Sequence, residues 1–226
     1  MPKCLSGNAL KILAALFMTI DHIGVILFPR VLLLRIIGRL ALPIYAFMIA
    51  EGCKYTRNKQ KYFGMVFGLG AVCQIVYYLF DGSLYFSILI TFSLSILMIY
   101  ALQNWKQKKT ALSGLVFGAA VIAVYLLNQW LTIDYGFWGC MLPVFAALPH
   151  GTDRDGIPMN TAMLGIGLIF LGLSLDLLQF CALMALPLLY AYNGNRGKLN
   201  LKYFFYIFYP SHLVLLEGIA ILMHYL

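Results

Sequence analysis

Charged residues are scarce in this sequence of 226 residues. Asp, Glu, Lys and Arg make up 11% of the chain, whereas about a quarter of an ordinary soluble domain is charged. Hydrophobic residues make up 62%, and the mean hydropathy is +0.87. No water-soluble fold can hide this much apolar surface. We therefore expect one integral membrane domain over residues 1–226, with the lipid bilayer as a partner.

Acidic residues are the rarer of the two charged kinds, at 8 against 16 Lys and Arg, which gives a net charge of +8. In a soluble protein this excess would favour nucleic-acid binding. In a membrane protein, Lys and Arg gather instead in the cytoplasmic loops. We therefore interpret the charge as a sign of topology and expect no nucleic-acid partner.

Cysteine and histidine motifs are also lacking. The five cysteines occur in no CxxC or CxxH spacing, and no HExxH is present. We expect the thiols to act as small packing residues rather than as disulfides or metal ligands. Asp21, His22 and His212 could supply three ligands, but their spacing is a weak signal, and we expect no metal. The first apolar run lacks an Ala-x-Ala-like cleavage site, so we expect a retained first span.

Long apolar runs fill most of the chain. A spanning helix needs about 20 mostly apolar residues, and this criterion predicts an all-α, polytopic helix bundle of about nine transmembrane helices. The sixth segment is short. The seventh and eighth form one run over residues 161–192, which we divide near Ser174; a single kinked helix is the rival interpretation. The nine segments are Ala9–Phe28, Val31–Ala50, Tyr62–Phe80, Tyr85–Leu102, Ala111–Leu131, Tyr135–Leu148, Thr161–Leu173, Leu175–Tyr192 and Lys202–Tyr225.

The basic residues predict the orientation. With the N-terminus in the cytoplasm, twelve of the sixteen lie on the inner side, and Arg30 is the basic residue of the outer connections. The outer connections carry Asp81, Asp134 and Asp176 instead. This asymmetry predicts an inner N-terminus and an outer C-terminus. The inner residues are Lys3, Lys54, Arg57, Lys59, Lys61, Lys106, Lys108, Lys109, Arg154, Arg196, Lys198 and Lys202.

The first segment, LKILAALFMTIDHIGVILFP, carries charge inside an apolar run. Each such charge costs about 2.5–3.5 kcal/mol on insertion scales, so it usually faces a cavity or a partner. Eleven residues are close to three helical turns, which places Lys11 and His22 on nearly one face, about 16 Å apart along the axis. Asp21 can hold a basic neighbour. The plainer alternative is that Lys11 snorkels to the inner headgroups and Asp21 caps the helix.

The second segment, LRIIGRLALPIYAFMIAEG, carries Arg35 and Arg39 on one face, because they are four residues apart. The short connection makes this segment the antiparallel neighbour of the first. We expect Arg39, the deeper of the two, to pair with Asp21, while Arg35 could instead reach the outer headgroups. Pro43 is expected to kink the helix.

The last segment contains YFFYIFYPSHLVLLEGI. His212 lies near its middle, with Tyr209 three residues before it on the same side and Pro210 between them. A lone membrane histidine can serve merely as a hydrogen bond between helices. The neighbouring proline and tyrosine favour a functional role for His212 and Tyr209.

These blocks, together with IDYGFWGC and KYFFYIFYPSHL, resemble the TraX family along the whole chain. Members are polytopic bacterial membrane proteins, and the named member is associated with acetylation of the pilin N-terminus. The resemblance implies an acetyltransferase of the bacterial cytoplasmic membrane that uses acetyl-CoA as co-substrate. It implies an exported peptide, such as a pilin, as acceptor, although a surface glycan remains open.

A more distant similarity links the chain to membrane acyltransferases of the acyltransferase-3 type. These carry an Arg, ten residues and a His on the first span, where this chain has Lys11 and His22. Lys lacks the bidentate fork of Arg, so an identical grip on a phosphate does not carry over.

The resemblance gives roles to the polar residues. His22 would be the base, Asp21 would orient it, and Arg39 would hold Asp21 or stabilise the oxyanion. His212 and Tyr209 would form a second wall of the site. Lys11 and Arg35 would contact substrates, while Lys54 and Arg57 would offer a positive rim to the acetyl-CoA phosphates.

Two other functions remain open from sequence. In a proton-coupled transporter, the histidines and Asp21 would relay protons. In a membrane assembly factor, the polar residues would only join helices. The lack of an internal repeat weakens the transporter interpretation.

Overall fold

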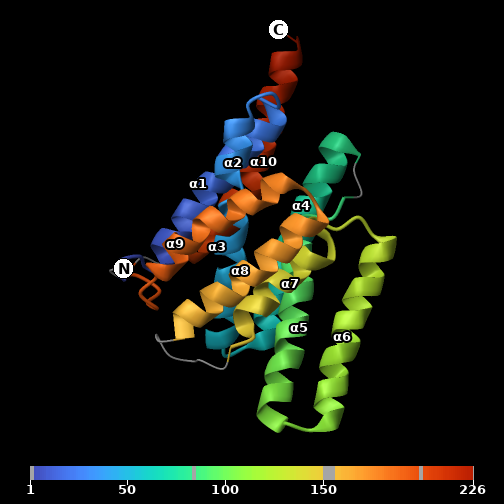
Figure 1. Cartoon of the computed structure of the whole chain (residues 1–226). Helices are drawn as coiled ribbons and strands as arrows, with labels where there is room; N and C mark the ends of the chain where they lie inside the picture. Colours follow the sequence, from blue (N-terminus) through green and yellow to red (C-terminus); the bar gives the residue numbers. More distant parts are fainter. Residues whose placement is uncertain (1–2, 83–84, 150–155, 199–200, 226) are drawn as a thin grey trace.

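The computed structural model describes residues 3–82, 85–149, 156–198 and 201–225, which form a helix bundle (Figure 1). Its elements are α1 (Gly7–Ile26), α2 (Leu32–Gly38), α3 (Ala41–Tyr55), α4 (Lys59–Asp81), α5 (Ile88–Lys108), α6 (Ala111–Trp130), α7 (Gly136–Ala147), α8 (Ile157–Ser174), the 3₁₀ helix η2 (Leu177–Ala185), α9 (Leu186–Tyr190) and α10 (Lys202–Tyr225).

Seven helical stretches among the described residues are long and apolar enough to cross a membrane, whereas the sequence predicted about nine spans. The remaining two predicted spans correspond to the shorter helix α7 and to η2 with α9. The division of residues 161–192 into two helices is confirmed: α8 ends at Ser174, and Asp176 caps η2 with its side chain.

The two shorter segments nevertheless run between the same two ends of the bundle. The hydroxyl of Thr91 donates to the carbonyl of Asp134 at one end of α5, and the ammonium of Lys106 donates to the carbonyl of Ala147 at the other. α7 therefore runs parallel to α5 over nearly its whole length. A 3₁₀ helix rises about 2.0 Å per residue, so η2 and α9 together cover about 25 Å with few residues.

The second predicted span is interrupted, as expected from Pro43, but Arg39 and Leu40 at the interruption keep helical backbone angles, so Leu32–Tyr55 still forms one stretch long enough to cross a membrane. α2 ends at Gly38 and α3 begins at Ala41. The cause is Pro43, which has no N–H to donate to the carbonyl of Arg39 four residues earlier and whose ring crowds that carbonyl. The break thus lies one turn before the proline, at Arg39 itself.

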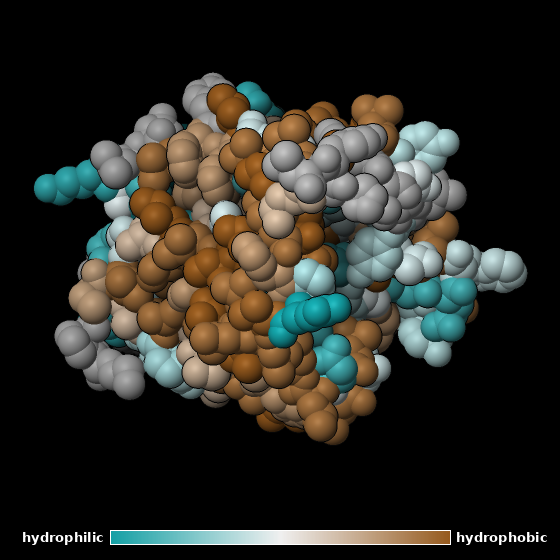
Figure 2. All heavy atoms as spheres, turned by 90° about the horizontal axis from the view of Figure 1, so that it is seen from above, coloured by the Kyte–Doolittle hydropathy of each residue, from teal (hydrophilic) through white to brown (hydrophobic). Residues whose placement is uncertain are grey.

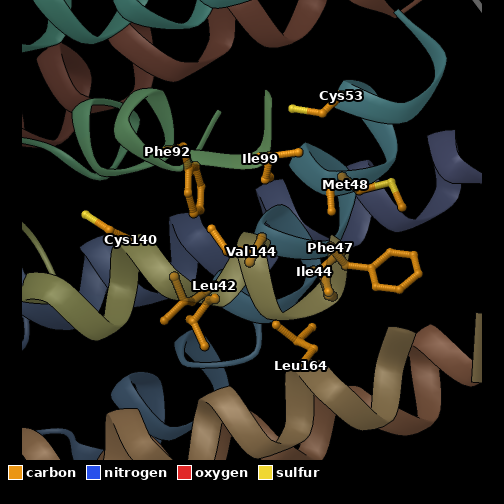
Figure 3. Packing of buried hydrophobic residues seen from close by; sticks show 14 of the residues in the cluster. Leu42, Ile44, Phe47, Met48, Cys53, Phe92, Ile99, Cys140, Val144 and Leu164 are labelled. Atoms are coloured by element: carbon orange, nitrogen blue, oxygen red, sulfur yellow. The ribbon is translucent and has the colours of Figure 1, made fainter. Parts of the chain in front are cut away.

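α3 lies at the centre of the bundle. Figure 3 shows Leu42 and Phe47 of α3 packed among side chains of α5, α7 and α8. Cys53 and Cys140 are buried in this cluster, as expected of small packing residues. α6 lies at the edge, where only Ser113 and Val124 are buried. Apolar side chains cover much of the face seen from above in Figure 2. The outward side of α6 suits contact with lipid, because Leu112, Leu115 and Ile122 are 72%, 70% and 61% exposed.

The elements alternate between two ends. We call them the Asp134 end, where α1 finishes, and the Lys54 end, where α3 finishes. α1 and α10 run in the same direction: residues near both of their N-termini line one cavity, and His22 meets His212 further along. An odd number of crossings requires this parallel arrangement. That the Lys54 end faces the cytoplasm stays a prediction from the distribution of basic residues.

Candidate functional site

Two histidines from the first and last helices meet inside the bundle. Nδ1 of His22 on α1 lies 2.9 Å from Nε2 of His212 on α10. Nδ1 of His212 lies 3.0 Å from the carbonyl oxygen of Phe208, and its ring stacks on the Phe208 ring. The His212 side chain is 5% exposed, so water does not replace these contacts.

This chain of contacts fixes the proton positions in the neutral rings. A carbonyl oxygen only accepts, so Nδ1 of His212 carries the proton and donates to Phe208. Nε2 of His212 is then an acceptor, and Nδ1 of His22 must donate to it. The remaining nitrogen of His22, Nε2, is left with a free lone pair. A neutral His22 in this arrangement is a base.

Asp21 is held by two arginines. Nη1 of Arg35 lies 2.9 Å from Oδ2, and Nη2 of Arg39 lies 3.5 Å from Oδ1. The predicted pairing of Arg39 with Asp21 is confirmed. The suggestion that Arg35 reaches the headgroups is wrong, because Arg35 makes the shorter of the two ion pairs. Arg35 and Arg39 are four residues apart and therefore share one face of the segment that packs antiparallel to α1. Both guanidinium groups thus reach the carboxylate of Asp21.

Gly38 allows this close packing. A Cβ atom at this position would collide with Cβ and Oδ1 of Asp21. α2 can therefore lie against α1 only because residue 38 has no side chain. The distance between the carboxylate and its arginines depends on that contact.

The connection before α7 completes the polar cluster. Nη1 of Arg39 donates to the hydroxyl of Tyr135 at 2.7 Å. Tyr135 and Gly136 both have left-handed backbones, at φ values of 58°. For a tyrosine this conformation is rare and points to a constrained, functional position. Next to it, the hydroxyl of Tyr85 donates to Asp134 at 2.7 Å. Withdrawal from water raises the pKa of Asp134 to about 6.

These groups line a cavity of about 840 Å³ in the half of the bundle toward the Asp134 end. We call it the histidine cavity. Asn128 and Gln179 also line it, and the side-chain oxygens of both make no hydrogen bond to other described residues. Buried polar atoms usually have partners, so these oxygens indicate a polar occupant.

A second cavity of about 420 Å³ lies in the half toward the Lys54 end. We call it the lysine cavity, because Lys11 lines it together with Arg196, Asn8, Tyr62 and Tyr206. Lys54 and Arg57 are not among its lining residues. Nζ of Lys54 lies instead 4.0 Å from Glu51.

Five residues line both cavities and form the wall between them, which we call the septum. Met18 lies one turn before His22, and Tyr209 lies one turn before His212, so the septum is directly on the Lys54 side of the histidine pair. A group that enters from the lysine cavity meets the septum before it meets His22. The septum consists of Met18, Tyr45, Ile88, Phe92 and Tyr209.

Comparison with protein families places these residues in a known group. The family model described as TraX protein matches residues 6–220. This chain belongs to the TraX family. The match includes both histidines, the Asp21 cluster and the connection at Tyr135, so the polar residues described above all lie within the part shared with the TraX family.

Two relatives of this TraX chain are informative. A probable fimbrial assembly protein, FimC of serogroup H1, from Dichelobacter nodosus is 27% identical over 93% of this chain and 94% of its own. An uncharacterized protein, RP591, from Rickettsia prowazekii strain Madrid E is 34% identical over 57% of this chain and 50% of its own. No solved structure gave a significant match.

The structure brings most of the predicted site residues of this TraX member together. His22, Asp21, Arg35, Arg39 and Tyr209 line the histidine cavity, and His212 contacts His22. Lys11 lies in the other cavity, and Lys54 and Arg57 line neither cavity. Among the described residues, no group of three or more His, Cys, Asp or Glu side chains is close enough to hold a metal ion.

Three residues that line the two cavities were not predicted as site residues from the sequence. Tyr135 received no role from the sequence, although it lies in IDYGFWGC, one of the blocks that resembles the TraX family. Arg196 was counted only for topology. Tyr45 gave no signal, because an aromatic residue in an apolar helix looks like any core residue.

Proposed function

We propose that this chain is a membrane-embedded acetyltransferase, which moves an acetyl group from cytoplasmic acetyl-CoA to an amine or hydroxyl of an exported acceptor. The observation that carries the proposal is the contact between His22 and His212. It leaves Nε2 of His22 unprotonated in the wall of a cavity where the side-chain oxygens of Asn128 and Gln179 have no hydrogen-bond partner among the described residues. A histidine base contributes about 10²–10⁴-fold to a reaction rate.

The reaction balances with the groups at hand. The acceptor nitrogen or oxygen attacks the carbonyl carbon of the thioester while its proton passes to Nε2 of His22. The carbonyl oxygen becomes an oxyanion, and the carbon–sulfur bond then breaks. The thiolate of CoA leaves and takes the proton from His22. Acetylated acceptor and free CoA are the products, and His22 returns to its neutral form.

Arg39 is suited to stabilise the oxyanion. Its side chain is 4% exposed, and its Nε makes no hydrogen bond to other described residues. Nη1 and Nη2 are occupied by Tyr135 and Asp21, which hold the guanidinium in place. A preorganised donor of this kind is worth more in a water-poor site than in water. Asp21 offsets one of the two positive charges that Arg35 and Arg39 place beside His22.

The acceptor enters, in this proposal, through the histidine cavity. The fimbrial assembly protein among the relatives supports a pilin-like exported peptide as acceptor, and a surface glycan is the alternative. The predicted orientation puts the histidine cavity on the outer side of the bacterial cytoplasmic membrane, where both kinds of acceptor are found, and puts the lysine cavity on the side that holds acetyl-CoA.

Purified protein in liposomes, supplied with acetyl-CoA labelled on the acetyl group, tests the proposal. Release of CoA and capture of label would be followed with a peptide amine and with a sugar as acceptors. We expect transfer by the native chain and a loss of at least 100-fold in His22→Ala. Thr19→Ala is the matched control, because Thr19 is on the same helix and its hydroxyl donates to the carbonyl of Ala15 one turn earlier. Equal transfer by native chain and His22→Ala would refute the role of His22.

A transporter is a second candidate, favoured by one observation: the two cavities lie in opposite halves of the bundle and meet at the septum. A pH-sensitive dye inside the same liposomes separates the two functions. Proton movement that depends on His22, without any release of CoA, would favour transport over acetyl transfer.

A further inference from the structure

The lysine cavity brings together two cations. The Lys11 side chain comes from α1, and Arg196 comes from the connection between α9 and α10. No Asp or Glu is present among the described residues that line this cavity. A cavity whose charged lining residues are both cationic favours an anionic ligand.

The backbone fixes Arg196 in this position. The first turn of α1 donates its free amides to the connection: Gly7 to the carbonyl of Asn195 and Asn8 to the carbonyl of Arg196, both at 2.8 Å. Gly197 follows with a φ of 96°, and a side chain there would crowd Ser6. Lys11 is three residues after Asn8 and lies on the same face of α1, one turn further along. Its side chain is therefore on the side of the helix that meets Arg196.

The rest of the cavity suits an extended ligand with one anionic end. Beyond the two cations, the lining is formed by Tyr62, Tyr206, Phe205 and Met65 and leads to the septum at Tyr209 and Met18. An occupant would thus have negative charge near the Lys54 end and a slender, less polar arm that points toward the histidine pair.

We propose that Lys11 and Arg196 bind the phosphate groups of the CoA thioester donor, whose pantetheine arm runs through the lysine cavity to the septum. The inference rests on the proposed function for the identity of the donor. It assigns a role to Arg196 and moves phosphate binding away from Lys54 and Arg57. Another source of the same phosphate chemistry is the headgroup of an anionic lipid.

Binding can be measured without turnover. The full chain would be placed in nanodiscs of phosphatidylcholine, and CoA and pantetheine, which lacks the nucleotide phosphates, would be titrated by calorimetry. We expect CoA to bind Lys11→Gln and Arg196→Gln at least about tenfold more weakly than it binds the native chain. The affinity for pantetheine should be the same in these variants and in the native chain. Lys54→Gln and Arg57→Gln are the matched controls and should change CoA affinity less than twofold.

Three results would overturn the inference. The first is unchanged CoA affinity in both Lys11→Gln and Arg196→Gln, and the second is a loss confined to the control variants. The third comes from the variants Lys11→Arg and Arg196→Lys. These keep the positive charge and are expected to keep most of the affinity for CoA. If they lose as much as the glutamine variants, the effect is structural and the assignment is wrong.

Two further comparisons distinguish CoA from an anionic lipid as the source of the phosphate, and distinguish this binding site from the proposed acetyltransferase activity. In nanodiscs with phosphatidylglycerol, CoA affinity should be unchanged; retention of that lipid through Lys11 and Arg196, with no CoA binding, would overturn the donor assignment. CoA binding through both cations without any transfer would retain this site and refute the acetyltransferase. Transfer that depends on His22, with CoA affinity independent of both cations, would retain the enzyme and refute the site.

Discussion

Nδ1 of His22 lies 2.9 Å from Nε2 of His212, although 190 residues separate them along the chain. The contact joins the first helix of the bundle to the last. His212 itself is anchored to the carbonyl of Phe208, so it acts on the site through His22 rather than on the acceptor. In the proposed reaction His212 is a positioning residue that holds the ring of His22 with Nε2 unprotonated.

Substitution of His212 should therefore reduce turnover without a matching loss of substrate binding. His212→Phe keeps the aromatic stack on Phe208 but removes the acceptor for Nδ1 of His22. We expect kcat to fall by about 10–100-fold, the size expected for one hydrogen bond to a charged group, with KM changed little. His212→Gln, which can still accept a hydrogen bond, should retain more activity. The measurement is kcat and KM for acetyl transfer at several pH values.

The pH profile distinguishes positioning from simple packing. Loss of the acceptor for His22 should move the acidic limb of the kcat profile, because the protonation of His22 is no longer supported by His212. A fall in kcat of equal size in both variants, with an unmoved profile, would contradict the positioning role.

The sequence predicted much of this arrangement, for reasons that can be stated for particular residues. Charges in an apolar run are costly, so Asp21, His22 and Arg39 stood out and were expected to meet. The division of residues 161–192 was visible because Asp176 follows Ser174 in an otherwise apolar stretch. His212 was recognised through its neighbours Tyr209 and Pro210.

Other features could not be predicted because they depend on three-dimensional packing. The direct contact of His22 with His212 requires α1 and α10 to lie side by side. The nine predicted spans imply that the first and last helices run in parallel, but no local pattern encodes that they are neighbours. The interruption at Arg39 agrees with the kink expected from Pro43, but its position one turn before the proline was not specified in advance. Arg196 looked like one more cytoplasmic charge, and only the backbone bonds of Gly7 and Asn8 bring it beside Lys11.

Gly38 offers a test of how tightly the Asp21 cluster is packed. Gly38→Ala places a methyl group where Asp21 now lies, so α1 and α2 must separate or the carboxylate must move from Arg35. We expect a loss of about 1–3 kcal/mol in stability and a clear loss of acetyl transfer. Thermal unfolding in detergent and the transfer assay measure the two effects.

Gly118→Ala is the matched control for Gly38. Gly118 also lies inside a helix, and a Cβ there would meet nothing within 4 Å. This change should leave stability unchanged or raise it by about 0.5–1 kcal/mol through helix propensity alone. If both alanines behave alike, close packing at Asp21 does not matter for the site.

Asp134 predicts a pH dependence of stability. Its pKa of about 6 lies above the ordinary value of 3.8, because its carboxyl group is withdrawn from water. The folded state therefore holds this proton more tightly than the unfolded state. The stabilisation is full below about pH 4 and is lost as the pH rises through about 6. Because Asp134 is ionised at pH 7.5, we expect the protein to unfold at a lower temperature at pH 7.5 than at pH 5.

Comparison with Asp134→Asn isolates this effect from that of other titrating groups. The asparagine keeps the shape but not the charge, so the difference between the two pH values should shrink in the variant. Thermal unfolding of both proteins at matched ionic strength gives the comparison. A pH dependence that is identical in the two proteins would show that Asp134 does not titrate in this range.

The septum should limit the water that reaches the thioester where it passes from the lysine cavity to the acceptor beside His22, and Met18 is the residue that tests this. Met18 is 6% exposed, lines both cavities and precedes His22 by one turn. Met18→Ala opens a passage through which water in the histidine cavity can reach the donor. Water would then attack the acetyl carbonyl, with its proton passing to His22, and release acetate and CoA.

We expect Met18→Ala to raise the ratio of acetate released to acceptor acetylated by several-fold, measured with labelled acetyl-CoA in the presence and absence of acceptor. Met18→Leu conserves the volume and should keep the native ratio. Met184→Ala is a control for the loss of a methionine, since Met184 is 61% exposed. Core truncation costs about 2–5 kcal/mol, so only the ratio in folded protein is informative. An unchanged ratio in folded Met18→Ala would mean that the wall between the cavities does not exclude water, and that His22 itself selects the acceptor over water.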